Sequence, residues 1–165
     1  MVSQSRSGGG LCAFLAYVSA DVTNFVGDDV FRTIPFNAEV FDIGGDYDNT
    51  TYMFTAPFDG KFQFYFCVLT SQITGTGMNN WELQILDSPL TFSMKNENTN
   101  PLPAVIPTQN NGSIWGSITQ LFDLDMGDTV TPSMSMGTGA PSANVITLDG
   151  GTSPYVSVFC GYSVI

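Results

Sequence analysis

The sequence predicts one all-β domain, built as a sandwich or barrel of short antiparallel strands. Its 165 residues include 13 Phe and 6 Tyr among many Val, Ile and Thr, and these residue types favour strands over helices. Short apolar runs are separated by Gly beside Asp or Asn, which is turn chemistry. The regular spacing of these breaks, without a convincing helical period anywhere, is typical of a sandwich or barrel.

The expected strands follow one another along the whole chain. Residues 1–10 are rich in Ser and Gly, so we expect a flexible lead-in or linker there, followed by a single domain over 11–165. The breaks fall near Gly27, Gly44, Gly60, Gly75, Gly112, Gly127 and Gly150. The predicted strands are 12–19, 31–35, 38–42, 51–56, 61–70, 81–87, 90–95, 114–124, 128–135, 144–148 and 155–164.

Three of these strands are apolar on both faces. They are CAFLAYV (12–18), FQFYFCVL (62–69) and VSVFCGY (156–162). A strand with one solvated face should alternate apolar with polar residues, and a domain of this length has no third layer to cover a second apolar face. The simplest cover is another copy of the same chain, so the sequence predicts an oligomer.

The charge balance and the missing histidine restrict the function. Fifteen acidic residues against four basic ones give a net charge of −11, which repels nucleic acid and anionic membranes. The chain contains no His, so the usual general base, the Ser-His-Asp triad and His-ligated metal sites are absent. We therefore predict a protein that is not an enzyme, with no catalytic residues, no nucleic-acid partner and no segment inserted into a membrane.

The cysteines and the acidic clusters remain as candidate chemistry. Cys12, Cys67 and Cys160 have no metal-binding spacing, and an odd count in apolar stretches predicts buried free thiols. No cofactor is required by any motif. Calcium takes several oxygen ligands from flexible loops, so a calcium site is one reading of the cluster Asp42, Asp46 and Asp48, and solvated turn aspartates are the other.

A spaced aromatic pattern surrounds the strongest predicted strand. Its positions are Phe36, Asp42, Tyr47, Phe54, Gly60, Phe62, Phe64 and Phe66. The pattern resembles the signature of the complement C1q globular-head family, with one departure at Phe62, where the family prefers Tyr. Further family strands are resembled, in the right order over 11–165, by Ala13-Phe14-x-Ala16, Phe122-x-Leu124-x-x-Gly127-Asp128-x-Val130 and Phe159-Cys160-Gly161-Tyr162.

The resemblance implies a ten-stranded jelly-roll sandwich of the C1q and tumour-necrosis-factor (TNF) type that assembles as a homotrimer. It implies a recognition head that binds a cell-surface, glycan or protein partner outside the cell, on a cell or virion surface, for example at the tip of a microbial or phage fibre. A structural cap that trimerises a stalk and a TNF-like signalling ligand remain alternatives. The expected contact surfaces are the regions of Trp81 and Trp115 and the loops 95–112 and 131–154.

The alternation of the strand Phe62–Leu69 divides its residues between the two expected environments. Phe62, Phe64, Phe66 and Val68 share one face, which we assign to the protomer core. Gln63, Tyr65, Cys67 and Leu69 share the other face, which then faces the three-fold axis. The trimer interface is thus predicted at Tyr65 and Cys67, beside Phe159 of the last strand.

Overall fold

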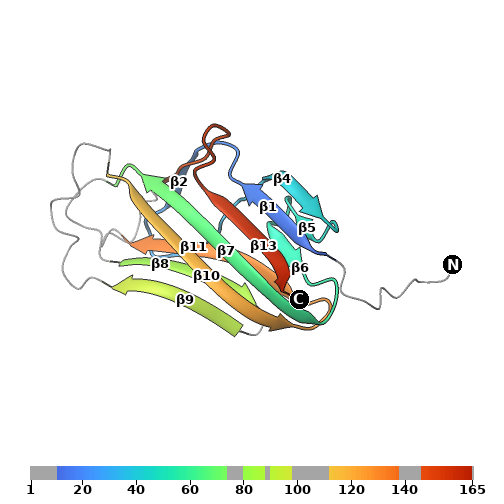
Figure 1. The fold of residues 1–165 in the computed structure, drawn as a ribbon. Coiled ribbons are helices and arrows are strands. Elements are labelled where there is room, and N and C mark those ends of the chain that lie inside the picture. The colour runs from blue at the N-terminus through green and yellow to red at the C-terminus, as the bar shows by residue number, and fades with distance from the viewer. Residues whose placement is uncertain (1–10, 74–79, 88–89, 98–111, 138–145, 165) are drawn as a thin grey trace.

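The computed structural model describes residues 11–73, 80–87, 90–97, 112–137 and 146–164. Within these ranges all regular elements are strands, which confirms the predicted all-β class (Figure 1). No helix in the described ranges has the length and apolar character needed to cross a bilayer. The strands are β1 (Ala13–Tyr17), β2 (Val22–Val26), β3 (Arg32–Thr33), β4 (Ala38–Ile43), β5 (Tyr47–Asp48), β6 (Met53–Thr55), β7 (Gly60–Ser71), β8 (Asn80–Asp87), β9 (Leu90–Glu97), β10 (Ile114–Leu124), β11 (Thr129–Gly137), β12 (Ile146–Leu148) and β13 (Val158–Val164).

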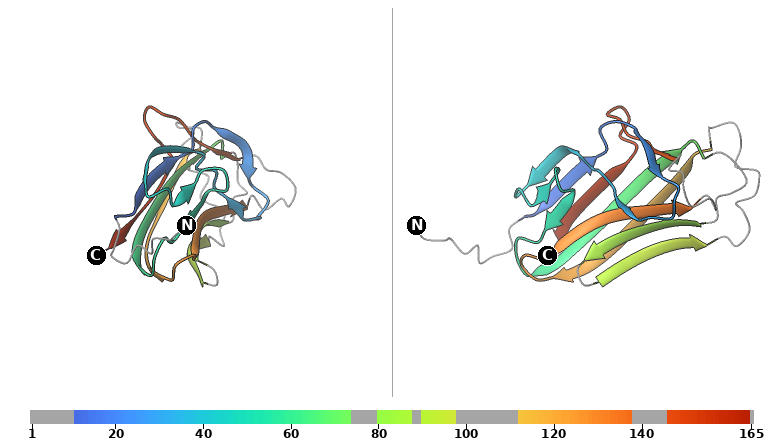
Figure 2. Two further views of the ribbon diagram at one scale, coloured as in Figure 1. Left: turned by 90° about the vertical axis from the view of Figure 1, so that its right-hand side faces the viewer. Right: turned by 180° about the vertical axis from the view of Figure 1, so that it is seen from behind.

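The strands form two sheets that pack as two layers (Figure 2). The seven-stranded sheet contains β4, β1, β13, β7 and β10 side by side, with β12 beside the end of β7 and β2 outside β12. The six-stranded sheet has the order β5-β6-β11-β8-β9, and β3 pairs with β11. Without β2, β3 and β12, two sheets of five strands remain, which is the expected ten-stranded jelly roll.

Strand β7 occupies the centre of the seven-stranded sheet. Each of its residues from Gly60 to Thr70 pairs with a residue of β10, and its other edge pairs with β13 and then with β12. Its buried and accessible residues alternate as predicted, with Phe62, Phe64, Phe66 and Val68 fully buried. A strand that is paired on both edges and buried on one face has no freedom to slip, because a one-residue shift would turn its aromatic face outward.

An aromatic cluster fills the space between the two sheets. The ring of Phe14 lies 4.7 Å from Tyr47 and 4.9 Å from Phe159, measured between centroids. Phe64 lies 5.1 Å from Phe54 in an edge-to-face arrangement. Such pairs add to the free energy of burial, by about 0.5–1.5 kcal/mol each.

The strand predictions hold, with two omissions. Every predicted strand has an observed counterpart, although residues 144 and 145 lie outside the described ranges. The omitted strands are β2 and β5. In β2, Asn24 has a φ of 57°, and the burial does not alternate, so no period of two is visible in the sequence. β5 has only two residues beside a Gly-rich turn. The expected lead-in 1–10 lies outside the described residues.

Candidate functional site

The outer face of the seven-stranded sheet is the larger of two candidate surfaces. Residues paired across an antiparallel ladder point to the same side, so the register defines this face. On β7, the outward residues include Tyr65 and Cys67, opposite Cys160 and Val158 of β13. All residues of β1, β7, β10 and β13 are described, and among their outward side chains only Lys61 and Asp123 are charged. These two form an ion pair of 2.8 Å at one end of the sheet.

Large apolar side chains are exposed across this outer face. Trp115 is 59% exposed, Tyr162 49% and Tyr65 36%. A solvated sheet face normally carries polar residues, and contiguous apolar patches beyond a few hundred Å² mark interaction sites. The outer face therefore has the composition of an interface. Further exposed members are Phe41, Ile43, Leu121 and Val164, and half-buried members are Leu15, Tyr17, Leu69 and Val158.

A tyrosine and two thiols lie at the centre of the outer face. Tyr65 is paired with Cys160 on β13 and with Thr119 on β10. Burial raises the pKa of the Cys67 and Cys160 thiols, and the hydrogen bond between Cys67 and Tyr65 opposes this only in part. Both cysteines are free and half-buried, whereas Cys12 is fully buried. The two outer thiols are therefore neutral at neutral pH and behave as small apolar groups.

The prediction that Phe159 belongs to the interface is wrong. Phe159 pairs with Phe66 of β7, so it points to the same side as that buried ring, and it is 0% exposed. Its ring contacts Phe14 and Phe36 between the two sheets. The residue of β13 that lies beside Tyr65 is Cys160, one position later. The interface prediction for Tyr65 and Cys67 stays a prediction, and the structure places both on the outer face.

The signature residues hold the turn between β4 and β5 and the strands around it. The Asp42 carboxylate accepts hydrogen bonds from the backbone N–H of Tyr47 at 3.1 Å and of Asp46 at 3.4 Å. The Tyr47 hydroxyl donates to the backbone carbonyl oxygen of Phe36 at 2.8 Å. The signature rings Phe36, Tyr47, Phe54, Phe62, Phe64 and Phe66 are buried, and Gly60, half-buried, begins β7.

The acidic residues considered for calcium have other partners. Asp48 accepts hydrogen bonds from the backbone N–H and the hydroxyl of Thr50, at 2.8 and 2.6 Å, and these bonds lower its pKa to about 2. Asp46 interacts with the Cys12 thiol. Among the described residues, no group of three or more Cys, Asp or Glu side chains is placed to hold a metal ion. The geometry does not add support to the calcium reading, which stays a prediction.

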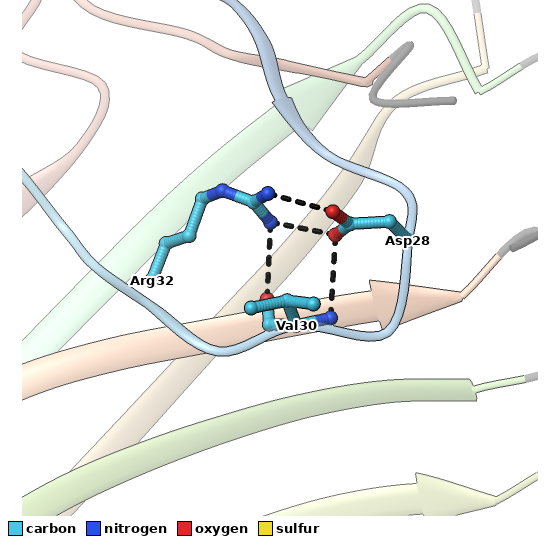
Figure 3. A network of polar contacts seen from close by, with 3 residues as sticks. All are labelled: Asp28, Val30 and Arg32. Atoms are coloured by element: carbon cyan, nitrogen blue, oxygen red, sulfur yellow. Dashed lines mark hydrogen bonds and ion pairs between the residues drawn. The ribbon is translucent and has the colours of Figure 1, made fainter. Parts of the chain in front are cut away.

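The second candidate surface is the loop of residues 27–32 between β2 and β3 (Figure 3). The Arg32 guanidinium donates two hydrogen bonds to the two Asp28 carboxylate oxygens, at 2.6 and 2.7 Å. Between these residues, Val30 and Phe31 are exposed. The hydrogen bond from Arg32 lowers the pKa of Asp28 to about 2. The sequence predicts only a turn near Gly27 and a strand over 31–35 here, and no pairing of Asp28 with Arg32. The available clue was an acidic residue four positions before one of only four basic residues.

The other expected contact regions are only partly described. Trp115 lies on the outer face of the seven-stranded sheet, opposite Leu69. The side chain of Trp81 and most of the segment 95–112 fall outside the described residues. Much of the segment 131–154 is not a loop, because β11 extends to Gly137 and β12 covers Ile146–Leu148.

Comparison with solved structures places this fold among known jelly rolls. The globular domain of zebrafish complement 1qA protein is similar with a TM-score of 0.62 and 18% identity, over 94% of this chain and 98% of that chain. Murine APRIL is similar with a TM-score of 0.56 and 13% identity, over 94% of this chain and 100% of that chain. No protein-family model matches the sequence. Comparison with curated proteins finds no significant match. The chain therefore has the C1q/TNF-like jelly-roll fold, a relation shown by structure alone.

Proposed function

We propose that the chain is a non-catalytic recognition head that works as a homotrimer and binds a protein or glycan partner outside the cell. The observation that carries this proposal is the outer face of the seven-stranded sheet. That face spans β4, β1, β13, β7 and β10, exposes apolar and aromatic side chains, and carries charge on β1, β7, β10 and β13 only at one end. An exposed apolar face of this kind is expected to be buried in an interface, and a second copy of the chain can bury it.

Three copies are favoured by the sequence resemblance to C1q globular heads and by the likeness of the fold. A three-fold assembly brings three sets of loops to one side of the particle, so weak contacts add up through avidity. A recognition role needs no more than a rigid scaffold with exposed loops. The proposed setting is an extracellular, cell or virion surface, including the tip of a microbial or phage fibre.

The partner class follows from the charge. A net charge of −11 per chain becomes −33 in a trimer, which disfavours nucleic acids and anionic glycans. Neutral glycans and proteins with basic or apolar surfaces are compatible with such a particle. The signalling and purely structural alternatives predict a receptor protein and no ligand, respectively.

Two measurements test the proposal. Light scattering coupled to size exclusion at micromolar concentration should give three times the chain mass of 17.7 kDa. The same protein applied to arrays of neutral glycans and of cell-surface ectodomains should bind at least one of them. A monomer in the first measurement would contradict the assembly. A trimer that binds nothing on broad arrays would leave the structural cap as the function.

We further propose that folding and assembly require no cofactor. Both Asp42 oxygens and one Asp48 oxygen already accept hydrogen bonds from the turn between β4 and β6. A ligand that binds only the folded state raises its stability, by about 2.7 kcal/mol at a hundredfold excess over Kd. We expect the melting temperature to be the same with a chelator and with millimolar calcium. A higher melting temperature in calcium would establish a site, which Asp42→Asn and Asp48→Asn would locate.

A further inference from the structure

We propose that the loop 27–32 is a preformed apolar contact that inserts Val30 and Phe31 into an apolar pocket on a partner protein, with basic side chains around the pocket. The inference rests on the recognition function proposed above and names the surface and partner chemistry. Val30 is 52% exposed and Phe31 39%, and these two consecutive residues are called the apolar tip of the loop below. Buried aromatic and aliphatic anchors of this kind contribute most of the free energy of binding at protein interfaces.

The ion pair between Asp28 and Arg32, called the clasp below, joins the two sides of the loop (Figure 3). Arg32 donates to Asp28 through its two terminal guanidinium nitrogens, Nη1 and Nη2. The Asp28 oxygen that accepts from Arg32 at 2.6 Å also accepts from the Val30 N–H at 3.2 Å. Arg32 also donates to the Val30 carbonyl oxygen at 3.2 Å. The backbone on both sides of Val30 is thereby fixed from within the loop. A bidentate guanidinium–carboxylate pair imposes a geometry that a lysine cannot reproduce.

The loop is also anchored to the edge of β11. The N–H of Asp29 donates to the carbonyl oxygen of Met136 at 3.1 Å, and Gly27 and Asp28 form bridges with Gly137. Asp29 has a φ of 62°, in the left-handed region that ordinary residues rarely adopt. The contacts to Met136 and Gly137, together with the clasp, hold this conformation. The result is a short loop whose backbone is ordered before any partner arrives.

The clasp is better explained by preorganisation than by stability. The pair is partly buried, with the Arg32 and Asp28 side chains 28% and 18% exposed, and the loss of hydration offsets much of what such a pair contributes to folding. Yet Arg32 is one of only four basic residues in the chain. Ordering a loop in advance removes an entropic cost from binding, so the clasp raises affinity for a partner without touching it. Pairing Asp28 with Arg32 also neutralises both charges beside the apolar tip.

The position of the loop leaves it accessible in the proposed assembly. The loop joins β2, the outermost strand beyond β12 in the seven-stranded sheet, to β3 of the six-stranded sheet, and it is anchored to β11. The proposed assembly face spans the outer side of β4, β1, β13, β7 and β10. It also lies away from the end of the molecule at which β1 begins and β13 ends (Figure 1). A trimer built on the outer face therefore presents three such loops.

The chemistry of the tip selects the partner. Two apolar side chains gain free energy in a dry pocket, which a protein surface offers and a neutral glycan does not. Asp29 is exposed beside the tip, and the whole chain is strongly acidic. Basic residues around the pocket would complement this charge and speed association.

The test uses a phage library of small folded domains with randomised concave surfaces, selected on the immobilised wild-type protein. We expect enriched domains whose randomised surfaces combine apolar and basic residues, and we expect Phe31→Ser to weaken their binding roughly 30-fold. Arg32→Lys keeps the positive charge but loses the guanidinium group that makes two parallel hydrogen bonds to Asp28. This substitution should weaken binding about three- to tenfold. The control is Met126→Ser, because Met126 is 70% exposed in the turn between β10 and β11 and should leave the affinity unchanged. Melting temperature and particle mass of each variant confirm that it is folded and assembled.

Selected domains that bind Phe31→Ser as well as wild type overturn the role of the loop but leave a recognition function in place. Equal affinity of Arg32→Lys and wild type overturns the preorganising role of the clasp. Failure to enrich any folded domain contradicts the loop and also counts against protein recognition, while the particle mass and the glycan array still test the rest of the proposed function.

Discussion

Phe159 lies opposite Phe66 in the antiparallel pairing of β13 with β7, and both rings are fully buried between the sheets. The next residue along β13, Cys160, therefore points outward and lies opposite Tyr65. This register separates the core face from the outer face, which we propose as the assembly face, within one pair of strands. Substitutions on neighbouring residues should consequently have different effects, one on folding and the other on assembly.

Tyr65→Asp is expected to break the trimer without unfolding the protomer. Tyr65 is 36% exposed at the centre of the outer face, so a carboxylate there is solvated in the monomer. On assembly, three such charges would be removed from water without partners, at a cost of several kcal/mol each. Light scattering should show a monomer with an intact far-ultraviolet spectrum. Met126→Asp, which adds the same charge at an exposed turn, should remain a trimer. A trimeric Tyr65→Asp of unchanged stability would show that the interface lies elsewhere.

Gly161→Ala is expected to destabilise the protomer itself. A Cβ atom at Gly161 would lie 2.6 Å from ring atoms of Phe64 and 2.7 Å from the ring of Phe14, closer than real contacts allow. Both rings are buried and cannot move freely, so we expect a loss of roughly 1–3 kcal/mol in the free energy of unfolding. Thr55→Ala, at an exposed position on β6 of the other sheet, is the control and should change little. Denaturant unfolding measures both, and equal stabilities would mean that the rings can repack.

The three cysteines should report assembly by their reactivity. Cys67 and Cys160 are half-buried on the outer face, and Cys12 is buried inside, where burial above all raises its pKa to about 12. Alkylation followed by mass spectrometry should leave all three unmodified in the trimer. In the Tyr65→Asp monomer, Cys67 and Cys160 should be modified slowly, as neutral thiols, while Cys12 stays protected until unfolding. Rapid modification of both outer cysteines in the wild-type trimer would contradict this assignment of the interface.

The clasp predicts a specific acid dependence. The hydrogen bond from Arg32 lowers the pKa of Asp28 from 3.8 to about 2. Because the folded-state pKa lies below the unfolded one, the contribution of the pair is complete above about pH 4 and is lost as the pH falls toward 2. Carboxyl chemical shifts should give a midpoint near 2 for wild type and a value closer to 3.8 in Arg32→Gln. The same low midpoint in Arg32→Gln would show that the backbone hydrogen bond, and not the guanidinium, controls Asp28.

The sequence alone determined most of the strands and the inner face of β7. Alternation in β7 predicts which residues lie inside because successive side chains on a strand point to opposite sides. The turn chemistry of Gly, Asp and Asn predicts where strands end. β2 escaped prediction because Asn24, with its positive φ, and irregular burial remove the period of two. The spacing of Phe36, Asp42 and Tyr47 resembles a family signature, and the structure shows its cause in the hydrogen bonds that join these residues.

Only the tertiary structure decided which residues from different strands meet. Phe159 and Cys160 are adjacent in an apolar run, and no pattern within that run says which one faces the core. The choice depends on the register between β13 and β7, a contact between residues more than 90 positions apart. The loop that carries Asp28 and Arg32 is likewise anchored to Gly137 of β11, more than 100 positions away in the sequence. Periodicity along one strand fixes the alternation of its side chains, but register is a relation between strands, and packing of the whole core selects it.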